Sequence, residues 1–367
     1  MALAIYRKYR PKLLEDLLGQ EHIVEILKNA ARQDKIAHAY LFSGPRGTGK
    51  TTAARLIAKI ANCETRQKDE KFKKSGEPCN KCGRCLEIDA GRALDVIEID
   101  GASNRGIDDI RELRESIKFV PTSYPYKVFI IDEMHMLTPP AFNALLKTLE
   151  EPPAHVIFVL ATTELEKVPP TISSRTQKFR FKKLTVEEIV KKLKKIAAAE
   201  KMSASDAALE LIASIAEGSL RDAESLLDQI TSLEEKVEVK TVERVLGQVS
   251  FSRTAALADL ILKADLKGSL NYIVQTLEAG YNVPDLNKEL IHYLRRVLSL
   301  KFDKDLEGIF KKEMTADELS QLKRHSLLID PARHINLLKS LIRAYSEMRY
   351  TPFVSVPMEI AIIENLS

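Results

Sequence analysis

The stretch GPRGTGKT at residues 44–51 restricts the possible folds of this chain more than any other part of its sequence. It matches the pattern G-x-x-x-x-G-K-[ST], follows the apolar run AYLFS and precedes the helix-forming run TAARLIAKIA. In such a strand–loop–helix unit, glycines let backbone N–H groups surround phosphates, and the helix N-terminus adds partial positive charge. The stretch therefore predicts a nucleotide-binding loop, in which Lys50 reaches the β- and γ-phosphates and Thr51 ligates magnesium. The predicted binding residues are Gly44, Pro45, Arg46, Gly47, Thr48, Gly49, Lys50, Thr51 and Thr52.

A pair of acidic residues follows about eighty residues later, in VFIIDEMH. An apolar strand would deliver Asp132 and Glu133 at its C-terminal end, where open α/β sheets bind their ligands. We expect Asp132 to hold magnesium through water and Glu133 to polarise the water that attacks the nucleotide. The alternative is that the two acids only cap the next helix. His135 completes the string D-E-x-H, which also occurs in some helicases, but by itself it indicates a packing or hydrogen-bonding residue.

The first 180 residues alternate short apolar runs with amphipathic patterns. Runs such as VFII lack polar alternation, which is typical of strands that are covered on both faces. Apolar residues recur at helical spacing in residues 107–117 and 142–149, and the second pattern is predicted to stop at Pro152. Strands that alternate with helices predict a parallel sheet flanked by helices. The five predicted strands are residues 39–44, 95–100, 127–132, 156–161 and 177–181.

After residue 181 the strand signal disappears and only helical patterns continue. One helix is predicted to begin at a capping box formed by Thr185 and Glu188. Its lysines at positions 191, 192, 194 and 195 are most simply explained as a solvated helix face. We place domain boundaries near residues 180 and 247. The predicted division is an α/β domain at 1–180, a small helical domain at 181–247 and an all-α domain at 248–367.

The four cysteines are Cys63, Cys79, Cys82 and Cys85, and the last three are each separated by two residues. The N-terminus lacks the apolar stretch of a signal peptide, and no apolar run approaches the roughly 20 residues that span a bilayer. We therefore expect a cytoplasmic protein without a membrane partner, in which thiols stay reduced. Reduced C-x-x-C-x-x-C clusters are typical of metal sites, and four thiolates satisfy a tetrahedral zinc ion. An iron–sulfur cluster and a set of unliganded thiols are the alternatives.

Two further candidates lie in LATTELEKVPPTISSRTQKFRF. Thr163, or its neighbour Thr162, follows a strand beside the one that carries Asp132, and a hydroxyl there could position water or contact the γ-phosphate. Arg175 precedes the last strand, where its guanidinium could reach a neighbouring subunit's nucleotide and stabilise charge on the transferred phosphoryl group. The alternatives are an ordinary threonine at a strand end and an arginine that pairs with a surface carboxylate.

Arg221 lies in GSLRDA at residues 218–223, at the start of a helix in the second predicted domain. If this domain folds over the nucleotide, the guanidinium can contact the phosphates and convert the phosphate state into a movement of the domain. The alternative is a local ion pair with Asp222 or Glu224.

Together these motifs resemble those of the AAA+ clamp-loader ATPases of bacteria, over essentially the whole chain. The resemblance rests on YRKYRPKLLEDLLGQEHI, HAYLFSGPRGTGKTT, VFIIDEMHML, FNALLKTLEEPP, TISSRT and GSLRDAESLLDQ, with the cysteine module between the loop and the second strand. It implies an α/β P-loop domain of AAA+ fold with a zinc module, then a helical lid and an all-α collar. It further implies that Thr163 is the first sensor, Arg221 the second and Arg175 a finger acting on a neighbouring subunit, where family members usually carry SRC instead of SRT. The residues implied to form the adenine pocket are Tyr9, Arg10, Pro11, Gly19 and Gln20.

The resemblance also implies a motor that uses ATP, Mg²⁺ and Zn²⁺ to open a sliding clamp and place it on primer–template DNA at the bacterial nucleoid. Its partners would be delta- and delta-prime-type subunits, with polymerase and helicase bound only by further C-terminal domains beyond Ser367. The net charge of +4 permits a DNA partner, and residues 101–109 are the predicted DNA surface, unless Asn104 and Arg105 only form a turn. The alternatives are a helicase, a non-hydrolysing structural subunit and a zinc-dependent nucleic-acid module. The all-helical remainder offers no second nucleotide-binding half for a helicase.

Overall fold

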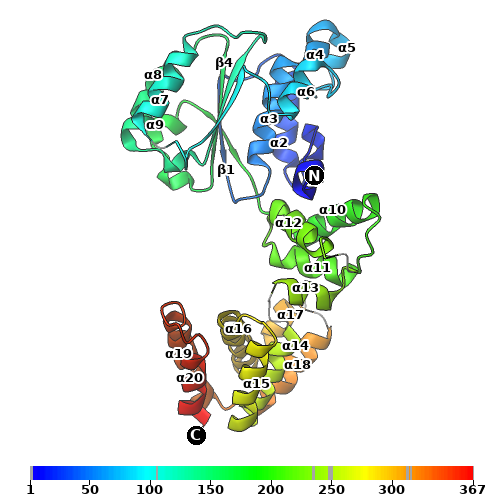
Figure 1. Ribbon diagram of the computed structural model, residues 1–367, viewed down its shortest axis with the longest axis vertical. Helices are drawn as coiled ribbons and strands as arrows, with labels where there is room; N and C mark the ends of the chain where they lie inside the picture. The colour runs from blue at the N-terminus through cyan, green and yellow to red at the C-terminus, as the bar shows by residue number, and fades with distance from the viewer. Residues whose placement is uncertain are drawn as a thin grey trace. The chain divides into compact units, whose positions relative to one another are not determined.

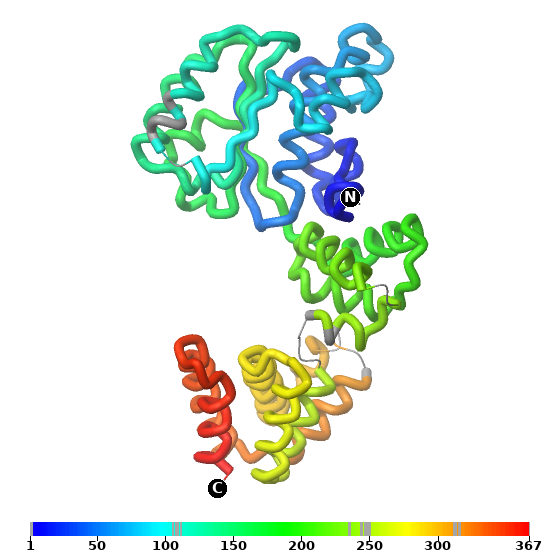
Figure 2. Tube along the Cα trace, viewed as in Figure 1, coloured from blue at the N-terminus to red at the C-terminus, as the bar shows by residue number. Residues whose placement is uncertain are grey.

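The structure, a computed structural model, describes residues 3–104, 106–233, 236–246, 251–310, 314 and 316–366. Contacts divide the chain into two compact units, Met1–Val237 and Glu238–Ser367, and Figure 2 traces the chain through both. The contacts keep the sheet and the helices that follow it in one unit, and residue 247 lies outside the described residues. The three-part division at residues 180 and 247 therefore stays a prediction.

The first unit is built on a five-stranded sheet. All strands pair in parallel, in the order β2-β3-β4-β1-β5. Every residue of β1 and β4 is buried, as expected for strands covered on both faces. The predicted parallel sheet is confirmed, and each strand lies within one residue of its predicted bounds. The strands are β1 (Ala39–Ser43), β2 (Val96–Asp100), β3 (Lys127–Asp132), β4 (Val156–Thr162) and β5 (Gln177–Arg180).

Helices cover both faces of this sheet, as Figure 1 shows. On one face lie α2 (Glu21–Arg32) and α3 (Lys50–Asn62), and on the other lie α7 (Ile107–Ile117) and α8 (Pro139–Glu150). Neighbouring residues of β1 point to opposite faces, so Phe42 packs in the core under α2 and α3, whereas Leu41 packs under α7 and α8. The end of α8 at Glu150 confirms the stop that was predicted from the prolines after it.

Short elements connect these layers. A small lobe of α4, α5 and α6 between α3 and β2 carries the cysteines, and α6 packs against α3. The buried Lys59 of α3 anchors this lobe, because its Nζ lies 2.8 Å from Asp89 Oδ1 at the end of α6. The short elements are α1 (Ile5–Lys8), η1 (Leu14–Asp16), α4 (Glu64–Lys68), α5 (Glu70–Lys73), α6 (Gly83–Asp89), η2 (Met134–Met136), η3 (Leu165–Lys167) and α9 (Pro170–Ser173).

Three helices complete the first unit and are called the lid below: α10 (Val186–Ala199), α11 (Asp206–Ile215) and α12 (Leu220–Thr231). The predicted capping box at the start of α10 is confirmed. The Glu188 N–H donates to Thr185 Oγ1 at 3.2 Å, and the Thr185 N–H donates to Glu188 Oε2 at 2.8 Å. In the lid, α12 packs against α1 as well as against α10 and α11, so the start of the chain lies directly on the lid.

The described residues of the second unit form helices and loops only, which confirms the predicted helical remainder. The long helix α16 contacts α14, α18 and α19 around one apolar core. Among the described residues, no helix is both long and apolar enough to cross a membrane. The elements are α13 (Val239–Leu246), α14 (Phe251–Leu262), α15 (Leu266–Glu278), α16 (Val283–Phe302), η4 (Lys304–Leu306), α17 (Glu307–Phe310), α18 (Ala316–Leu328), α19 (Pro331–Glu347) and α20 (Val356–Leu366).

Candidate nucleotide site and metal centre

The loop between β1 and α3 has a backbone that only glycine adopts readily. Gly44, Gly47 and Gly49 have φ angles of 141°, 73° and 103°, which disfavour any side chain. Space excludes one as well, because a Cβ at Gly44 would lie 2.4 Å from the carbonyl oxygen of Phe181, and one at Gly47 would lie 1.9 Å from Ser219 Oγ. The loop therefore packs tightly against the end of β5 on one side and the start of α12 in the lid on the other.

Lys50, the first residue of α3, holds its ammonium group inside this loop. Its Nζ donates to the carbonyl oxygens of Gly44 and Pro45, each at 2.8 Å, and the side chain is almost fully buried. Burial lowers the pKa of Lys50, while the negative charges of Glu133 and Asp132 oppose that shift. The cation and the two acids predicted from separate motifs thus lie close enough to interact electrostatically.

The end of β3 meets the start of α3. The Thr51 hydroxyl donates to Asp132 Oδ2 at 2.6 Å, so the two predicted magnesium ligands are in direct contact. Glu133 follows with a left-handed backbone, φ 44°, and this uncommon conformation in a non-glycine residue is typical of functional sites. Among the described contacts, the Glu133 side chain makes no capping bond to η2, and the Asp132 carboxylate accepts from the Glu133 N–H at 2.9 Å.

The structure distinguishes between the two threonines at the end of β4. The Thr163 hydroxyl donates to Glu133 Oε2 at 2.9 Å. Thr162 is buried, and its Oγ1 lies 3.0 Å from His135 Nδ1 and accepts from the Glu164 N–H at 3.0 Å. Thr163 is therefore the hydroxyl that faces the acidic pair, and His135 makes the hydrogen-bonding contact expected of it.

A pocket lies over the loop, between the sheet and the lid. It brings together the predicted residues 46–52, Asp132, Glu133, Arg221, Arg10 and Pro11. The sequence interpretation missed Tyr6, Leu17, Leu18, Leu184, Leu220 and Glu224, which also line it. The only sequence signal for the lid residues was that Leu220, Arg221 and Glu224 share one face of a helix at three- and four-residue spacing.

Arg221 enters this pocket from the first turn of α12. Its guanidinium carbon lies 5.1 Å from the centre of the Tyr6 ring, within the range of a cation–π contact. No ion pair to Asp222 or Glu224 is found among the described contacts of Arg221. The side chain is thus oriented toward the N-terminal segment and the nucleotide-binding loop.

Three residues that the resemblance implies for the adenine pocket, Tyr9, Gly19 and Gln20, do not line the pocket described above. They hold the N-terminal segment in position instead. The Tyr9 hydroxyl donates to Glu200 at the end of α10. The buried Gln20 side chain donates to the Lys182 carbonyl at 2.9 Å and accepts from the Lys182 N–H at 3.0 Å. Gly19 has φ 66°, and a Cβ there would lie 2.6 Å from a methyl carbon of Leu184.

Arg175 is absent from the residues that line the pocket in the described part of the chain. Its Nη2 lies 2.5 Å from Glu150 Oε1 at the end of α8, and its Nη1 donates to the Thr171 carbonyl at 2.8 Å. The surface ion pair that was the alternative interpretation is therefore present. The side chain remains about one-third exposed.

The predicted DNA surface is described only in part, because Arg105 lies outside the described residues. Asn104 Nδ2 donates to the Asp100 carbonyl at 3.1 Å, and the Ser103 hydroxyl donates to Asp100 Oδ2 at 2.8 Å. The turn that was the alternative interpretation of Asn104 is thus formed. Contact with DNA stays a prediction.

The four cysteines meet at one point. Their Sγ atoms all lie within 4.8 Å of one another, with 4.0 Å between those of Cys79 and Cys85. A zinc–sulfur distance of about 2.3 Å separates the sulfurs of a tetrahedral site by about 3.8 Å, so the cluster could hold a metal ion. The hydrogen bond between the Cys85 and Cys63 sulfurs lowers the pKa of Cys63 and raises that of Cys85, so these two sulfurs share one site.

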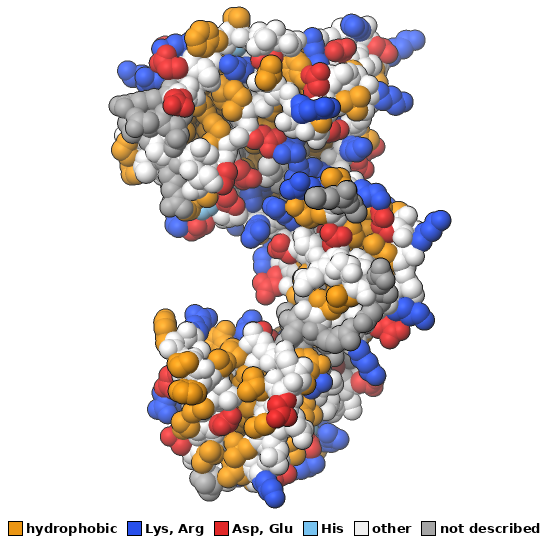
Figure 3. Space-filling model, viewed as in Figure 1, with side chains coloured by type: hydrophobic (Ala, Val, Ile, Leu, Met, Phe, Trp, Pro, Cys, Tyr) orange, Lys and Arg blue, Asp and Glu red, His pale blue; other side chains and the backbone are white. Residues whose placement is uncertain are grey.

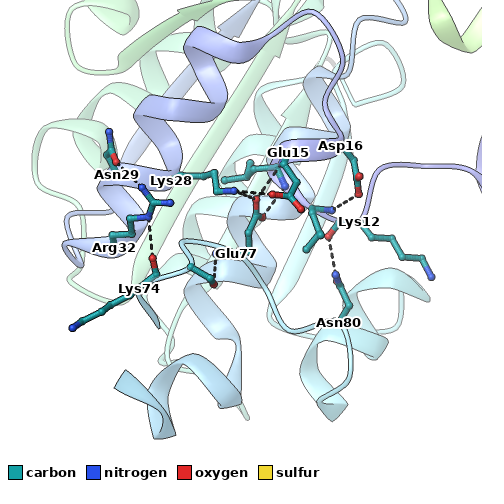
Figure 4. Close-up of polar contacts among 12 residues, drawn as sticks. Lys12, Glu15, Asp16, Lys28, Asn29, Arg32, Lys74, Glu77 and Asn80 are labelled. Carbon is teal, nitrogen blue, oxygen red and sulfur yellow. Dashed lines mark hydrogen bonds and ion pairs between the residues drawn. The ribbon is translucent and has the colours of Figure 1, made fainter. Parts of the chain in front are cut away.

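The cysteine lobe is tied to the N-terminal segment by the polar contacts in Figure 4. The nearly buried Glu77 accepts from the Leu14 N–H at 2.7 Å, and its Oε1 lies 2.9 Å from Lys28 Nζ. Asn80, next to a cysteine, donates to the Lys12 carbonyl at 3.0 Å. Lys12 and Leu14 lie a few residues before Leu17 and Leu18, which line the nucleotide pocket. The lobe therefore supports one wall of that pocket.

The sheet order, the loop before α3, the acids at the end of β3 and the helical lid together define the AAA+ class of P-loop proteins. Comparisons with known proteins narrow the class. Residues 19–185 match the family model described as DNA polymerase III, delta subunit, and residues 188–233 match that of the DNA polymerase III clamp loader subunit, ATPase lid domain.

Full-length relatives agree with these matches. The chain is 43% identical to DNA polymerase III subunit tau of Bacillus subtilis and 38% identical to that of Escherichia coli, over 98% of its own length but only 62% and 55% of theirs. It is 36% identical to DNA polymerase III subunit gamma of Buchnera aphidicola, over 98% of both chains. The chain belongs to the DNA polymerase III gamma/tau subunit family. The resemblance to clamp-loader subunits is thereby confirmed.

Proposed function

We propose that this chain is the ATP-hydrolysing motor subunit of a bacterial clamp loader, which opens a ring-shaped sliding clamp and places it on primer–template DNA at the nucleoid. Membership of the gamma/tau family supports the assignment. The observation that carries it is the convergence of a buried Lys50, the Thr51–Asp132 pair and Glu133 on one pocket, with Thr163 hydrogen-bonded to Glu133 from behind the pocket lining. A subunit that only supports the assembly would not need this set of groups.

The pocket residues divide the work of ATP hydrolysis. The loop N–H groups and Lys50 bind the phosphates. The Thr51 hydroxyl and the Asp132 carboxylate are the groups that would hold magnesium, which supplies positive charge near the β- and γ-phosphates when it is bound. Glu133 accepts a proton from the attacking water as the water oxygen bonds to the γ-phosphorus and the bond to the β-phosphate oxygen breaks. Thr163 orients Glu133 through the hydrogen bond between them.

Arg221 links the nucleotide to the lid. Because it projects from α12 into the pocket, contact with the γ-phosphate would draw the whole helix toward the loop. Hydrolysis would remove that contact and release the lid. In an assembly, this movement would change the fit between neighbouring subunits and let the clamp close on DNA.

We propose that the second unit is the collar through which subunits associate, including delta- and delta-prime-type partners. Figure 3 shows hydrophobic side chains gathered on the visible face of this unit, over α15, α19 and α20. Exposed apolar patches of this kind mark contact surfaces. The exposed large apolar residues of these three helices include Val274, Leu277, Ile342, Ile360 and Ile363.

The cysteine module is proposed to hold one structural zinc ion. Four sulfur ligands leave no open coordination position, which is typical of zinc sites that stabilise a fold. Zinc would fix the lobe that holds residues 12–14, and thereby the wall of the nucleotide pocket.

Metal content tests the zinc assignment. We expect about one zinc ion per purified chain, and loss of zinc together with a lower melting temperature in Cys82→Ser, because structural zinc contributes directly to folding free energy. Lys81→Ala, in the same turn, is the control and should keep the metal. Iron with inorganic sulfide would identify a cluster instead, and a metal-free chain of unchanged stability would contradict the proposal.

Turnover in the assembled complex tests the motor. With delta- and delta-prime-type partners, the chain should hydrolyse ATP several-fold faster when clamp and primed DNA are both present, since the assembly completes the site only on its target. The same assembly built with Lys50→Ala should show no such stimulation. A wild-type rate that ignores clamp and DNA would contradict the loader role, absence of hydrolysis would identify a structural subunit, and strand separation would identify a helicase.

A further inference from the structure

One side chain in the nucleotide pocket has no role in the chemistry above. Glu224 lies one turn into α12, lines the pocket and is only 4% exposed. Its Oε1 is fully enclosed and has no hydrogen-bond partner in the part of the chain that the structure describes. A buried carboxyl oxygen without a partner is unfavourable unless the group is neutral or a ligand satisfies it.

The position of Glu224 indicates which end of the nucleotide it meets. Arg221 and Asp228 lie one turn before and one turn after it on the same helix face, and both contact the N-terminal segment. Arg221 lies over the Tyr6 ring, and Asp228 Oδ2 accepts from the Ile5 N–H at 3.4 Å. Glu224 therefore faces the N-terminal wall of the pocket, whereas the phosphates belong at the loop around Lys50.

The remaining wall at this end suits a planar base. Its residues include Pro11, Leu17, Leu18 and Leu184, which are apolar. A base that enters this space is desolvated, so its polar edge needs a partner. Glu224 is the unsatisfied polar group that the described pocket offers there.

A carboxyl group recognises different bases in its two protonation states. Adenine presents a ring-nitrogen acceptor, N1, beside an amino donor, N6, and a neutral carboxyl group matches both with one O–H donor and one acceptor oxygen. Guanine presents two donors, N1–H and N2–H, which match the two acceptor oxygens of a carboxylate. The described residues give the buried Oε1 of this carboxyl no hydrogen-bond partner, so burial favours its neutral form over the carboxylate.

The charges around Glu224 agree with this. Burial raises its pKa to about 7, while the positive charges of Lys192 on α10 and Arg10 beyond α1 partly oppose the shift. Arg221 on its own helix is directed toward Tyr6. The buried residues of α11, the remaining helix packed on α12, are Ala208, Leu209, Ile212 and Ala213, which carry no charge.

We propose that Glu224 determines the base specificity of this site, with its neutral carboxyl group pairing with N1 and N6 of adenine. The inference rests on the proposed nucleotide-dependent function and deepens it. It assigns the preference for ATP over GTP to a single residue of the lid. Glu224, which selects the base, and Arg221, which closes the lid, would then lie one turn apart on the same helix.

Equilibrium binding to wild type and two variants tests the assignment. Wild-type chain should bind ATP more tightly than GTP, and Glu224→Gln should keep the ATP affinity because an amide offers a permanent donor beside an acceptor. Glu224→Leu fills the same space without either, and should weaken ATP binding by about 10-fold or more. If Glu224 only fills space, Glu224→Leu should bind ATP at least as tightly as wild type, because removing an unpaired buried acid stabilises the lid. Melting of the nucleotide-free variants shows that each is folded.

A pH series adds a readout that packing does not affect. Between pH 6 and 8 the wild-type ATP affinity should fall by up to about 10-fold relative to Glu224→Gln, because the neutral form is lost as pH rises through a pKa of about 7. The preference over GTP should fall with it. Equal ATP binding by wild type and Glu224→Leu would overturn the inference, as would Glu224→Gln binding as weakly as Glu224→Leu.

A third arm uses 2′-deoxy-ATP. If Glu224 instead accepts from a ribose hydroxyl, wild type and Glu224→Gln would distinguish ATP from its deoxy form while Glu224→Leu would not, and the base assignment would be overturned. Failure of wild type to bind either nucleotide would overturn the proposed function and this inference with it. ATP binding that Glu224→Leu leaves intact would overturn the inference alone.

Discussion

Replacing Glu133 with glutamine is expected to lower kcat for ATP hydrolysis by about 10²–10⁴-fold while leaving ATP affinity nearly unchanged. Glutamine keeps the size of the side chain and an oxygen that can accept from the Thr163 hydroxyl, which now lies 2.9 Å from Glu133 Oε2. It removes the negative charge that takes up a proton from the attacking water. Single-turnover hydrolysis in the assembled complex, with binding measured separately, would separate the two quantities.

The matched control for this variant is Glu164→Gln. Glu164 is also a carboxylate at this edge of the sheet, but its contacts are His135 Nε2 at 3.2 Å and Lys167 Nζ at 2.8 Å. Removing its charge disturbs an exposed ion pair that contributes little, so kcat should be retained. Equal turnover in wild type and Glu133→Gln would remove Glu133 from the chemistry, and a parallel loss in both variants would point to a general field effect.

The sheet and the loop could be predicted because their signals are local in the sequence. Uninterrupted apolar runs identify buried strands, and the spacing of Gly44, Gly49 and Lys50 specifies a phosphate cradle whatever surrounds it. The cysteine cluster could be predicted equally well, since the short spacing of Cys79, Cys82 and Cys85 brings three thiols to one place. For these features, neighbouring residues in sequence are also neighbours in space.

The base end of the pocket could not be predicted in this way, because its walls come from distant parts of the chain. Only the packing of α1 on α12 brings Tyr6 next to Arg221 and leaves Glu224 in the pocket. The choice between Thr162 and Thr163 could not be predicted for the same reason. Adjacent residues at the end of a strand point to opposite sides, so the position of β4 beside β3 decides which threonine meets Glu133. Tertiary contacts, rather than residue type, settle such cases.

Arg175→Ala is expected to slow DNA-stimulated ATP hydrolysis in the assembled loader by about 10³–10⁵-fold, the range attributed to arginine fingers. The free energy of unfolding should change by less than about 1 kcal/mol, because the pair with Glu150 is exposed. Glu150→Gln is the control that distinguishes the two roles of the arginine. It removes the partner of the ion pair but keeps the guanidinium, so it should retain turnover if the finger acts on a neighbouring subunit.

Mixing two inactive variants tests whether that action is in trans. Arg175→Ala chains have a complete site of their own but lack the finger, and Glu133→Gln chains have the finger but lack the base. In assemblies that contain both, an Arg175→Ala site beside a Glu133→Gln neighbour receives the neighbour's Arg175, and hydrolysis should recover at that site. If the arginine served its own pocket, every site in the mixture would lack one catalytic group and no recovery could occur. An inactive mixture would therefore contradict action in trans. A loss of turnover in Glu150→Gln equal to that in Arg175→Ala would assign the effect to the surface ion pair instead.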